Sequence, residues 1–529
     1  MSDPHRPAPL PHITQNWTLD KPGAQGKRGM VVSQSTAAAE AGVAVLNAGG
    51  NAADAAAAAA FALAAVEPWN SGLGGIGFAV VLPAASREAH VVDFGPVASA
   101  ATDPARYPLT GRLKRDLFPW PEVEGDRNIH GPLSFCIPSA PAGYATLKER
   151  FGTALPMAEI LAPAIALARR GVAQDWFTTL KIASSASVLR LYTESARLYL
   201  PDGLPPVAPQ QGTPGFLPLG RLADTLERLA QAGVRDFYEG DVARDLVADI
   251  EDIDGIVGAG DLRDCQAAVR PSPTLDWRGR YRLHTAGGLT AAPTLEAVMA
   301  GMADLDLAGN GPDAGWYARL SQVMRGAYAE RLDGLGAAEP AQTCTSHLTV
   351  VDAEGTLVAM TTTLLSSMGS ATVLPRTGVL MNNGVMWFDP VAGSANAIRP
   401  GARPLCNMCP VVATPTDGGW PRYAVGASGG RRILASVYQM LAWTLDFGMD
   451  VQAAAHVARI DVSGPDGTSA DRRLPSEVLD ALAAAGPVEV VEHAVVPVNF
   501  ACPNMIRVTS EGAEGCSDVT SPWSAAMPA

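Results

Sequence analysis

The stretch from Ser35 to Pro68 constrains the fold more than any other part of the chain. Its sequence, STAAAEAGVAVLNAGGNAADAAAAAAFALAAVEP, predicts two alanine-rich helices broken at Gly49-Gly50, with Asn51 or Asp54 available to cap the second. The apolar run within it is only about a dozen residues long, well short of the roughly 20 that a membrane-spanning helix needs. We therefore expect a buried helix whose small side chains allow close approach of its neighbours.

Length and charge narrow the class of protein. A chain of 529 residues exceeds the usual single-domain size, which favours two or three structural units or one large layered body. The net charge of -14 argues against nucleic acid or an anionic membrane as a partner. The N-terminal segment has no apolar stretch of the signal-peptide kind, so we expect a cytoplasmic protein.

The cysteines do not indicate a disulfide framework or a metal site. The chain has 7 of them, an odd number scattered over its length, and we expect them to be reduced. The one CxxC, Cys406-Asn407-Met408-Cys409, has no second pair or nearby histidine to complete a tetrahedral zinc site, so a structural role is the better interpretation. We expect neither a metal nor a cofactor.

Hydrophobic periodicity predicts a layered α/β body in place of a repeat array or a helix bundle. The predicted helices cover 141–150, 157–170, 221–232, 241–250, 294–304 and 313–331. The predicted strands cover 78–82, 90–93, 347–351, 356–362, 378–382, 410–414, 422–425 and 495–508. The Pro- and Gly-rich region 200–220 is expected to be a surface excursion.

Two glycine-rich motifs have more than one interpretation. Gly72 to Gly77 resembles a dinucleotide fingerprint, but these glycines follow a helix and precede a strand, the reverse of what a phosphate cradle needs. Gly426 to Gly430, GASGG, fits the GxSxG elbow of a serine hydrolase between a strand and a helix. Acidic and histidine residues follow it in the required order: Asp446, Asp450, His456 and His493. The same glycines at a helix N-terminus also suit an oxyanion site.

Small nucleophiles crowd the start of a predicted hairpin at 339–363, EPAQTCTSHLTVVDAEGTLVAMTTT. A threonine hydroxyl is a weak nucleophile unless a base is adjacent, and cutting the chain before the threonine makes its own α-amine that base. Such an amine has a pKa of about 7.7–8.0, which suits neutral pH. The alternative is that Thr and Ser simply favour strands.

Five blocks of sequence resemble the gamma-glutamyltransferase (gamma-glutamyltranspeptidase) family of N-terminal nucleophile hydrolases. Beside the helix pair with its glycine loop, TSHLTVVD resembles the family's processing site TTHxSVVD, RPLCNMCP its RPLSSMSP loop and VGASGGRRI its TGSPGGSRI. The resemblance implies an α+β fold, a four-layer αββα sandwich. It also implies a precursor that cuts itself into a large subunit, 1–344 with an N-terminal extension at 1–28, and a small subunit, 345–529.

The resemblance assigns the reacting groups. The scissile bond is Cys344-Thr345, with cleavage one bond earlier as the alternative, and Thr345 becomes both nucleophile and base. Thr363 matches the threonine that hydrogen-bonds the new amine, and Gly429 and Gly430 match the oxyanion hole. The GxSxG match then becomes incidental.

The substrate pocket departs from the family pattern. The expected carboxylate-clamping arginine of a DFRE-like segment is Gly95, and Trp387 stands where an acidic residue should hold the substrate ammonium. Cys406 and Asn407 replace the serine pair of the RPLSSMSP loop, and Leu365 replaces an expected asparagine. Asn383 keeps the asparagine of the NNQMDDF-like segment and is expected to bind substrate. We therefore expect a less zwitterionic acyl group. A relocated carboxylate anchor has four candidates, each of which could equally be a surface or structural charge: Arg399, Arg403, Arg431 and Arg432.

Together these features predict a self-processing, glutathione hydrolase-like amidohydrolase or acyltransferase acting on gamma-glutamyl or related N-acyl amides. Its expected partners are a small-molecule amide and its own second subunit, as a heterodimer or a dimer of heterodimers. The alternatives are a serine hydrolase that uses Ser428 and a non-catalytic binding protein on the same scaffold.

Overall fold

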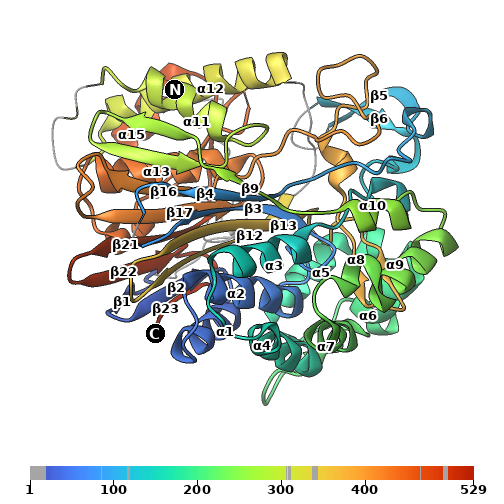
Figure 1. Cartoon of the computed structure of the whole chain (residues 1–529). Coiled ribbons are helices and arrows are strands. Elements are labelled where there is room, and N and C mark those ends of the chain that lie inside the picture. Colours follow the sequence, from blue (N-terminus) through green and yellow to red (C-terminus); the bar gives the residue numbers. More distant parts are fainter. Residues whose placement is uncertain are drawn as a thin grey trace.

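Two stacked seven-stranded sheets form the middle of the molecule, and helices cover their outer faces (Figure 1). The computed structural model describes residues 19–84, 86–115, 119–305, 307, 311–335, 343–464, 466–492 and 499–529. Every strand pairing in both large sheets is antiparallel. The predicted α+β, four-layer αββα sandwich is confirmed.

The first sheet runs in the order β1 (Ala24–Gly26), β22 (Gly512–Ser517), β21 (Cys502–Thr509), β17 (Arg422–Ser428), β16 (Val411–Pro415), β11 (Tyr281–Thr285) and β10 (Thr274–Trp277). The second runs in the order β23 (Ala525–Pro528), β2 (Gly29–Ser33), β12 (Thr343–Asp352), β13 (Leu357–Ser366), β3 (Ile76–Leu82), β4 (His90–Phe94) and β9 (Ala268–Pro271). Strand β1 falls within the segment 1–28, so part of the expected N-terminal extension is an edge strand.

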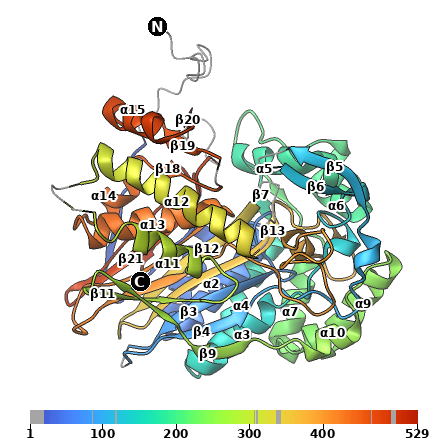
Figure 2. The same ribbon diagram turned by 90° about the horizontal axis from the view of Figure 1, so that it is seen from above.

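The helices separate into two layers and a lateral group. Under the second sheet lie α1 (Thr36–Asn47), α2 (Ala52–Val66), α3 (Ala140–Phe151) and α4 (Met157–Arg170). Over the first sheet lie α11 (Ala292–Gly301), α12 (Ala314–Leu335), α13 (Arg432–Leu445) and α15 (Ser476–Ala485). Helix α14 (Val451–His456) packs against β21 and β22 of the same sheet. Beside the sandwich lie α5 (Trp176–Leu189), α6 (Thr193–Tyr199), α7 (Leu222–Ala232), α8 (Asp236–Glu239), α9 (Asp241–Asp252) and α10 (Ala259–Asp264), as Figure 2 shows from above.

Short strands complete the description. The pairs are β5 (Leu109–Arg115) with β6 (Pro119–Val123), β7 (Val172–Ala173) with β8 (Phe216–Leu217), and β14 (Val373–Leu374) with β15 (Val379–Leu380). A further small sheet holds β18 (Ile460–Asp461), β19 (Thr468–Asp471) and β20 (Val488–Val491).

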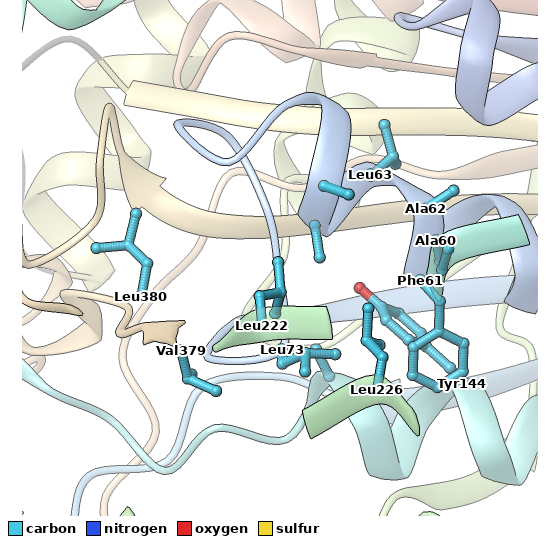
Figure 3. Packing of buried hydrophobic residues seen from close by; sticks show 14 of the residues in the cluster. Ala60, Phe61, Ala62, Leu63, Leu73, Tyr144, Leu222, Leu226, Val379 and Leu380 are labelled. Atoms are coloured by element: carbon cyan, nitrogen blue, oxygen red, sulfur yellow. The ribbon is translucent and has the colours of Figure 1, made fainter. Parts of the chain in front are cut away.

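Helix α2 is the centre of the lower core, as its alanines predict. Its N-cap Asn51 accepts hydrogen bonds from the next turn while Asp54 accepts one from the Asn51 N–H, a reciprocal capping box. Every residue of the helix is buried, and its Phe61 ring meets Tyr144 edge-on at 5.0 Å (Figure 3). Among the described helices, none is at once long and apolar enough to cross a bilayer.

Most predicted elements exist, with shifted ends. The strand predicted at 378–382 is only the two-residue β15, because the backbone turns at Gly378, whose φ is 71°. The strand predicted at 495–508 begins at Cys502 (β21), and 493–498 lie outside the described residues. Hydrophobic periodicity does not predict α5, because its serines and threonines are spread around the helix and leave no continuous apolar stripe.

Candidate active site

The threonine predicted as the nucleophile lies in strand β12 at a break in the pairing register. Cys344 pairs with Leu365 and Ser346 with Thr362, so β13 has an extra residue opposite Thr345. The Thr345 side chain is buried, with 2% of the residue exposed, and its Oγ1 donates a hydrogen bond of 3.2 Å to Thr363 Oγ1. The structure therefore brings the two sequence-predicted threonines together.

Leucine stands where the family pattern has asparagine, and its backbone supports Thr363. The Leu365 N–H donates to Thr363 Oγ1 at 2.8 Å. Leu365 has a φ of 85°, a conformation that costs a non-glycine residue of the order of 1–3 kcal/mol and persists only where the surroundings impose it. The strained backbone thus fixes the Thr363 hydroxyl that contacts Thr345.

A buried acid lies on the opposite face of β12. Ser346, the residue after the nucleophile, donates from Oγ to Glu67 Oε2 at 3.0 Å and accepts from Ser71 Oγ at 3.1 Å. Burial raises the pKa of Glu67 to about 7. Sequence spacing does not predict this chain of groups; its one signal in the sequence is an acidic residue, Glu67, at the C-cap of the alanine-rich helix α2.

A neutral histidine packs between the sheets beside the nucleophile. His347 Nδ1 lies 2.9 Å from Thr361 Oγ1, and burial lowers the pKa of the imidazole to about 3. A Cβ on Gly426 of β17 would lie 2.2 Å from the ring carbon Cε1. Glycine at position 426 is therefore what lets the two sheets approach here.

The two glycines matched to an oxyanion hole form the turn between β17 and α13. Gly429 has a φ of 136° and Gly430 a φ of 60°, conformations that favour glycine. Strand β17 packs against β12 and β13 across the sheet interface. The turn thus follows a strand that contacts both threonine strands, and it immediately precedes Arg431, the N-cap of α13.

The residues expected to complete a serine triad with Ser428 are bound elsewhere. Asp446 accepts a hydrogen bond of 2.8 Å from Trp277 Nε1 and pairs with Arg280, and Asp450 caps α14. His456 bonds the Gln452 carbonyl through Nδ1 and accepts from the Lys21 N–H through Nε2. His493 lies outside the described residues. Within the described chain no triad forms around Ser428.

The predicted pocket residues fall into two groups. Leu365, Trp387 and Cys406 share one apolar cluster with Ile76 and Phe78, and burial raises the pKa of the Cys406 thiol to about 12, so it stays protonated.

Asn383 and Asn407 are engaged by the protein. Asn383 Nδ2 donates to the Ile129 carbonyl at 2.7 Å and to Ser366 Oγ at 2.9 Å. Asn407 Oδ1 accepts from Arg331 Nη2 at 3.3 Å. Both amides therefore hold loops in place around the apolar cluster.

The glycines of the segment 72–77, which joins α2 to β3, allow close packing of the backbone. A Cβ on Gly74 would lie 2.1 Å from the Leu380 carbonyl oxygen, and one on Gly75 would lie 2.7 Å from that of Thr363. Of the residues that the structure describes, no three or more His, Cys, Asp or Glu side chains are grouped to hold a metal ion.

The arrangement of two antiparallel sheets between helix layers is the fold of the N-terminal nucleophile hydrolases. A cephalosporin acylase from Bacillus halodurans has this fold, with a TM-score of 0.83, 22% identity and coverage of 100% of this chain and 99% of that one.

The chain belongs to the gamma-glutamyltranspeptidase family, whose family model matches residues 38–343 and 333–527. It is 29% identical to an acylase ACY 1 proenzyme of Pseudomonas sp. (strain V22), over 91% of this chain and 90% of that protein. It is 26% identical to a glutathione hydrolase proenzyme of Escherichia coli (strain K12), over 89% and 87% of the two chains. The family is thus one of amidohydrolase proenzymes.

Proposed function

We propose that this chain is a precursor that cuts itself at Cys344-Thr345 and then acts as an amide hydrolase or acyltransferase on gamma-glutamyl or related N-acyl amides. Thr345 is the nucleophile in both reactions. The small subunit 345–529 stays bound to 1–344 as a heterodimer.

In the first reaction Thr345 Oγ1 attacks the carbonyl carbon of Cys344, and the C–N bond breaks as a new ester forms. Water then hydrolyses the ester, which leaves a carboxylate on Cys344 and a free α-amine on Thr345. In turnover this amine takes the Thr345 hydroxyl proton and passes it to the leaving amine of the substrate. Gly429 and Gly430 stabilise the oxyanion, and water or an acceptor amine releases the acyl group.

The observation that carries the proposal is the 3.2 Å contact between Thr345 Oγ1 and Thr363 Oγ1 at the β13 bulge. Two buried hydroxyls meet where the register is broken, and Thr363 Oγ1 also accepts from Leu365 N–H. A threonine present only for strand propensity needs no such arrangement.

Intact-mass analysis and N-terminal sequencing test this directly. The wild-type protein, 54.9 kDa as a single chain, is expected to give a fragment beginning at Thr345, while Thr345→Ala stays whole and inactive on amides. Thr349→Val is the matched control, since Thr349 is buried four residues further along the same face of β12.

A Thr345→Ala protein that still processes and turns over amides would overturn the proposal. A fragment beginning at Cys344 would move the nucleophile to that residue. A chain that stays whole, with activity lost in Ser428→Ala, would favour the serine hydrolase.

A further inference from the structure

One row of neighbouring residues crosses four strands from Thr345 to Gly95, just after β4. Thr363 lies against Thr345 and pairs with Ile76 of β3, and the β3–β4 register, in which Gly77 pairs with Phe94, places Gly95 opposite Ile76. Paired residues on adjacent strands share a face. Since strands lie about 4.8 Å apart, Gly95 is about 14 Å from Thr345 on the face between the sheets.

An arginine from another loop fills the space of the side chain that Gly95 lacks. A Cβ built on Gly95 would lie 2.5 Å from Arg403 Nη2 and 2.4 Å from Phe78 Cζ. The Arg403 guanidinium carbon also stands 6.0 Å from the centre of the Phe78 ring. Of the four arginines considered as a relocated anchor, Arg403 is therefore the one placed at the vacant position.

Among the described residues, Arg403 and Arg270 both pair with one carboxylate, that of Asp93. Asp93, 9% exposed, accepts a hydrogen bond from Arg403 Nη2 and lies 3.5 Å from Arg270 Nη2. The Gly95 N–H also donates to Asp93 Oδ1, at 3.1 Å. Two guanidiniums thus share one carboxylate. The Arg403 side chain is 41% exposed, so a second carboxylate can reach it.

The side chains around this row are apolar. Ile76, Leu365 and Trp387 belong to one buried cluster together with Phe78. Within the described residues the Trp387 Nε1 has no hydrogen-bond partner although it is buried. The row therefore joins Thr345 to a cation through apolar surroundings.

We propose that Arg403 determines specificity by binding a carboxylate at the far end of the acyl group. This inference rests on the proposed function. With the guanidinium at the Gly95 position and about 3 Å for the hydrogen bond, about 10 Å separates that carboxylate from the attacked carbonyl. The preferred donors are amides of long, apolar dicarboxylic acids, with a chain of about eight to ten carbons.

The first test uses the wild-type heterodimer and needs no variant. Anilides of ω-carboxyacyl groups of about four, six, eight and ten carbons are compared with ω-carboxamide analogues of equal length. We expect kcat/KM to favour the carboxylates by about tenfold to a hundredfold, the effect of one charge-assisted hydrogen bond, at the longer lengths. Equal rates for the carboxylate and carboxamide series, or a preference confined to the shortest chain, would overturn the proposal.

Variants of Arg403 then test whether this residue is responsible for the preference for carboxylate substrates. Arg403→Met is expected to abolish the carboxylate preference through KM while activity on the carboxamides stays within about threefold, and Arg403→Lys should keep part of it. Arg399→Met is the control, because Arg399 is exposed and precedes Arg403 by four residues on the same loop.

The outcomes separate the two proposals. Retention of the preference in Arg403→Met shows that another group binds the carboxylate. If Arg403→Met does not cut itself, the proposal is tested instead by the chain-length series on the wild-type protein and by the Arg403→Lys variant. A wild-type protein that cuts itself and hydrolyses amides without distinguishing a terminal carboxylate refutes only this inference, whereas a protein that does neither refutes the proposed function.

Discussion

The reacting threonines and the residues around the acyl pocket lie in two regions of different construction. Thr345 and Thr363 occupy central strands of a seven-stranded sheet, where the pairing register sets their positions. Trp387 ends a short 3-10 helix and Cys406 lies in a segment without helix or strand, while Leu365 lies near the end of β13 with a strained φ of 85°. The two strand-borne threonines keep the family pattern, whereas the changed pocket positions, apart from Leu365, lie outside the strands of the two large sheets. Loops accept substitutions that a shared register does not.

The largest loss of activity is expected from a substitution in the proposed oxyanion turn, Gly429-Gly430, where the backbone leaves no room for a side chain at Gly429. In Gly429→Ala the new Cβ would lie 2.8 Å from Ala501 Cα and the residue would keep an unfavourable φ of 136°. The turn must shift, and loss of one oxyanion donor lowers kcat by about a hundredfold to a thousandfold. Self-cleavage and kcat are measured together.

The control for that change is Gly393→Ala, which also has a positive φ, of 85°, but open space around the new Cβ. It should alter stability by about 1 kcal/mol and leave kcat unchanged. A Gly429→Ala enzyme with wild-type kcat would remove the turn from the mechanism.

A smaller effect is expected from Thr363→Val, which keeps the shape and removes the hydroxyl. The buried Leu365 N–H, now 2.8 Å from Thr363 Oγ1, loses its acceptor, which costs about 1–3 kcal/mol, and Thr345 loses its contact. We expect self-cleavage and turnover about tenfold to a hundredfold slower, read from the time course of fragment formation.

Thr361→Val is the control for Thr363→Val. Thr361 lies two residues away on the same face and bonds His347, not the nucleophile. It should lower thermal stability with a much smaller loss of rate. Equal rate losses in both variants would mean that packing, and not the Thr363 hydroxyl, controls the reaction.

Glu67, the buried acid bonded to Ser346 of β12, is expected to make the stability of the protein depend on pH. Because burial raises the folded-state pKa of Glu67 from 4.5 to about 7, the folded protein binds its proton more tightly than the unfolded chain. The stabilisation is complete below pH about 4.5 and is lost as the pH rises through about 7, a change of about 3 kcal/mol. Glu67→Gln should remove this slope and be the more stable protein at pH about 8.

Denaturant unfolding of both proteins across this pH range measures the difference. Glu159→Gln, in the first turn of the lower-layer helix α4, is the control and should follow the wild type. Parallel curves for wild type and Glu67→Gln would show that Glu67 is ionised in the folded protein throughout.

The smallest effect on rate is expected at a pocket position outside the two large sheets, from Cys406→Ser. The residue is 1% exposed in an apolar cluster, so a hydroxyl there costs about 1–3 kcal/mol of stability. Turnover of the best substrate should stay within about threefold, because no hydrogen bond to the thiol is needed for the Arg403 anchor. A rate loss as large as that of Thr363→Val would erase the contrast between the two regions.

The sequence could predict those parts of the site that follow from local pattern. Alternation at 347–363 gave the hairpin, and the resemblance gave the pairing of Thr345 with Thr363. The extra residue of β13 opposite Thr345 was not predictable, because alternation continues across a bulge without a change in residue type.

Contacts between distant segments were the least predictable. Glu67 and Ser346 are separated by 279 positions, and Asp93 and Arg403 by 310, so no spacing rule joins them. Arg403 could be named as one of four arginines, but only the space beside Gly95 distinguishes it from the other three.

The order of strands in the two sheets has a consequence for the protein after processing. In the second sheet β2, β3, β4 and β9 come from before Thr345, while β13 and β23 come from after it, and the first sheet is mixed in the same way. A cut at Cys344-Thr345 therefore leaves two polypeptides that can part only by unravelling both sheets. Folding begins as an event within one molecule, but any later recovery from denaturation requires two chains to find each other, so heat inactivation of the mature form becomes a one-way process.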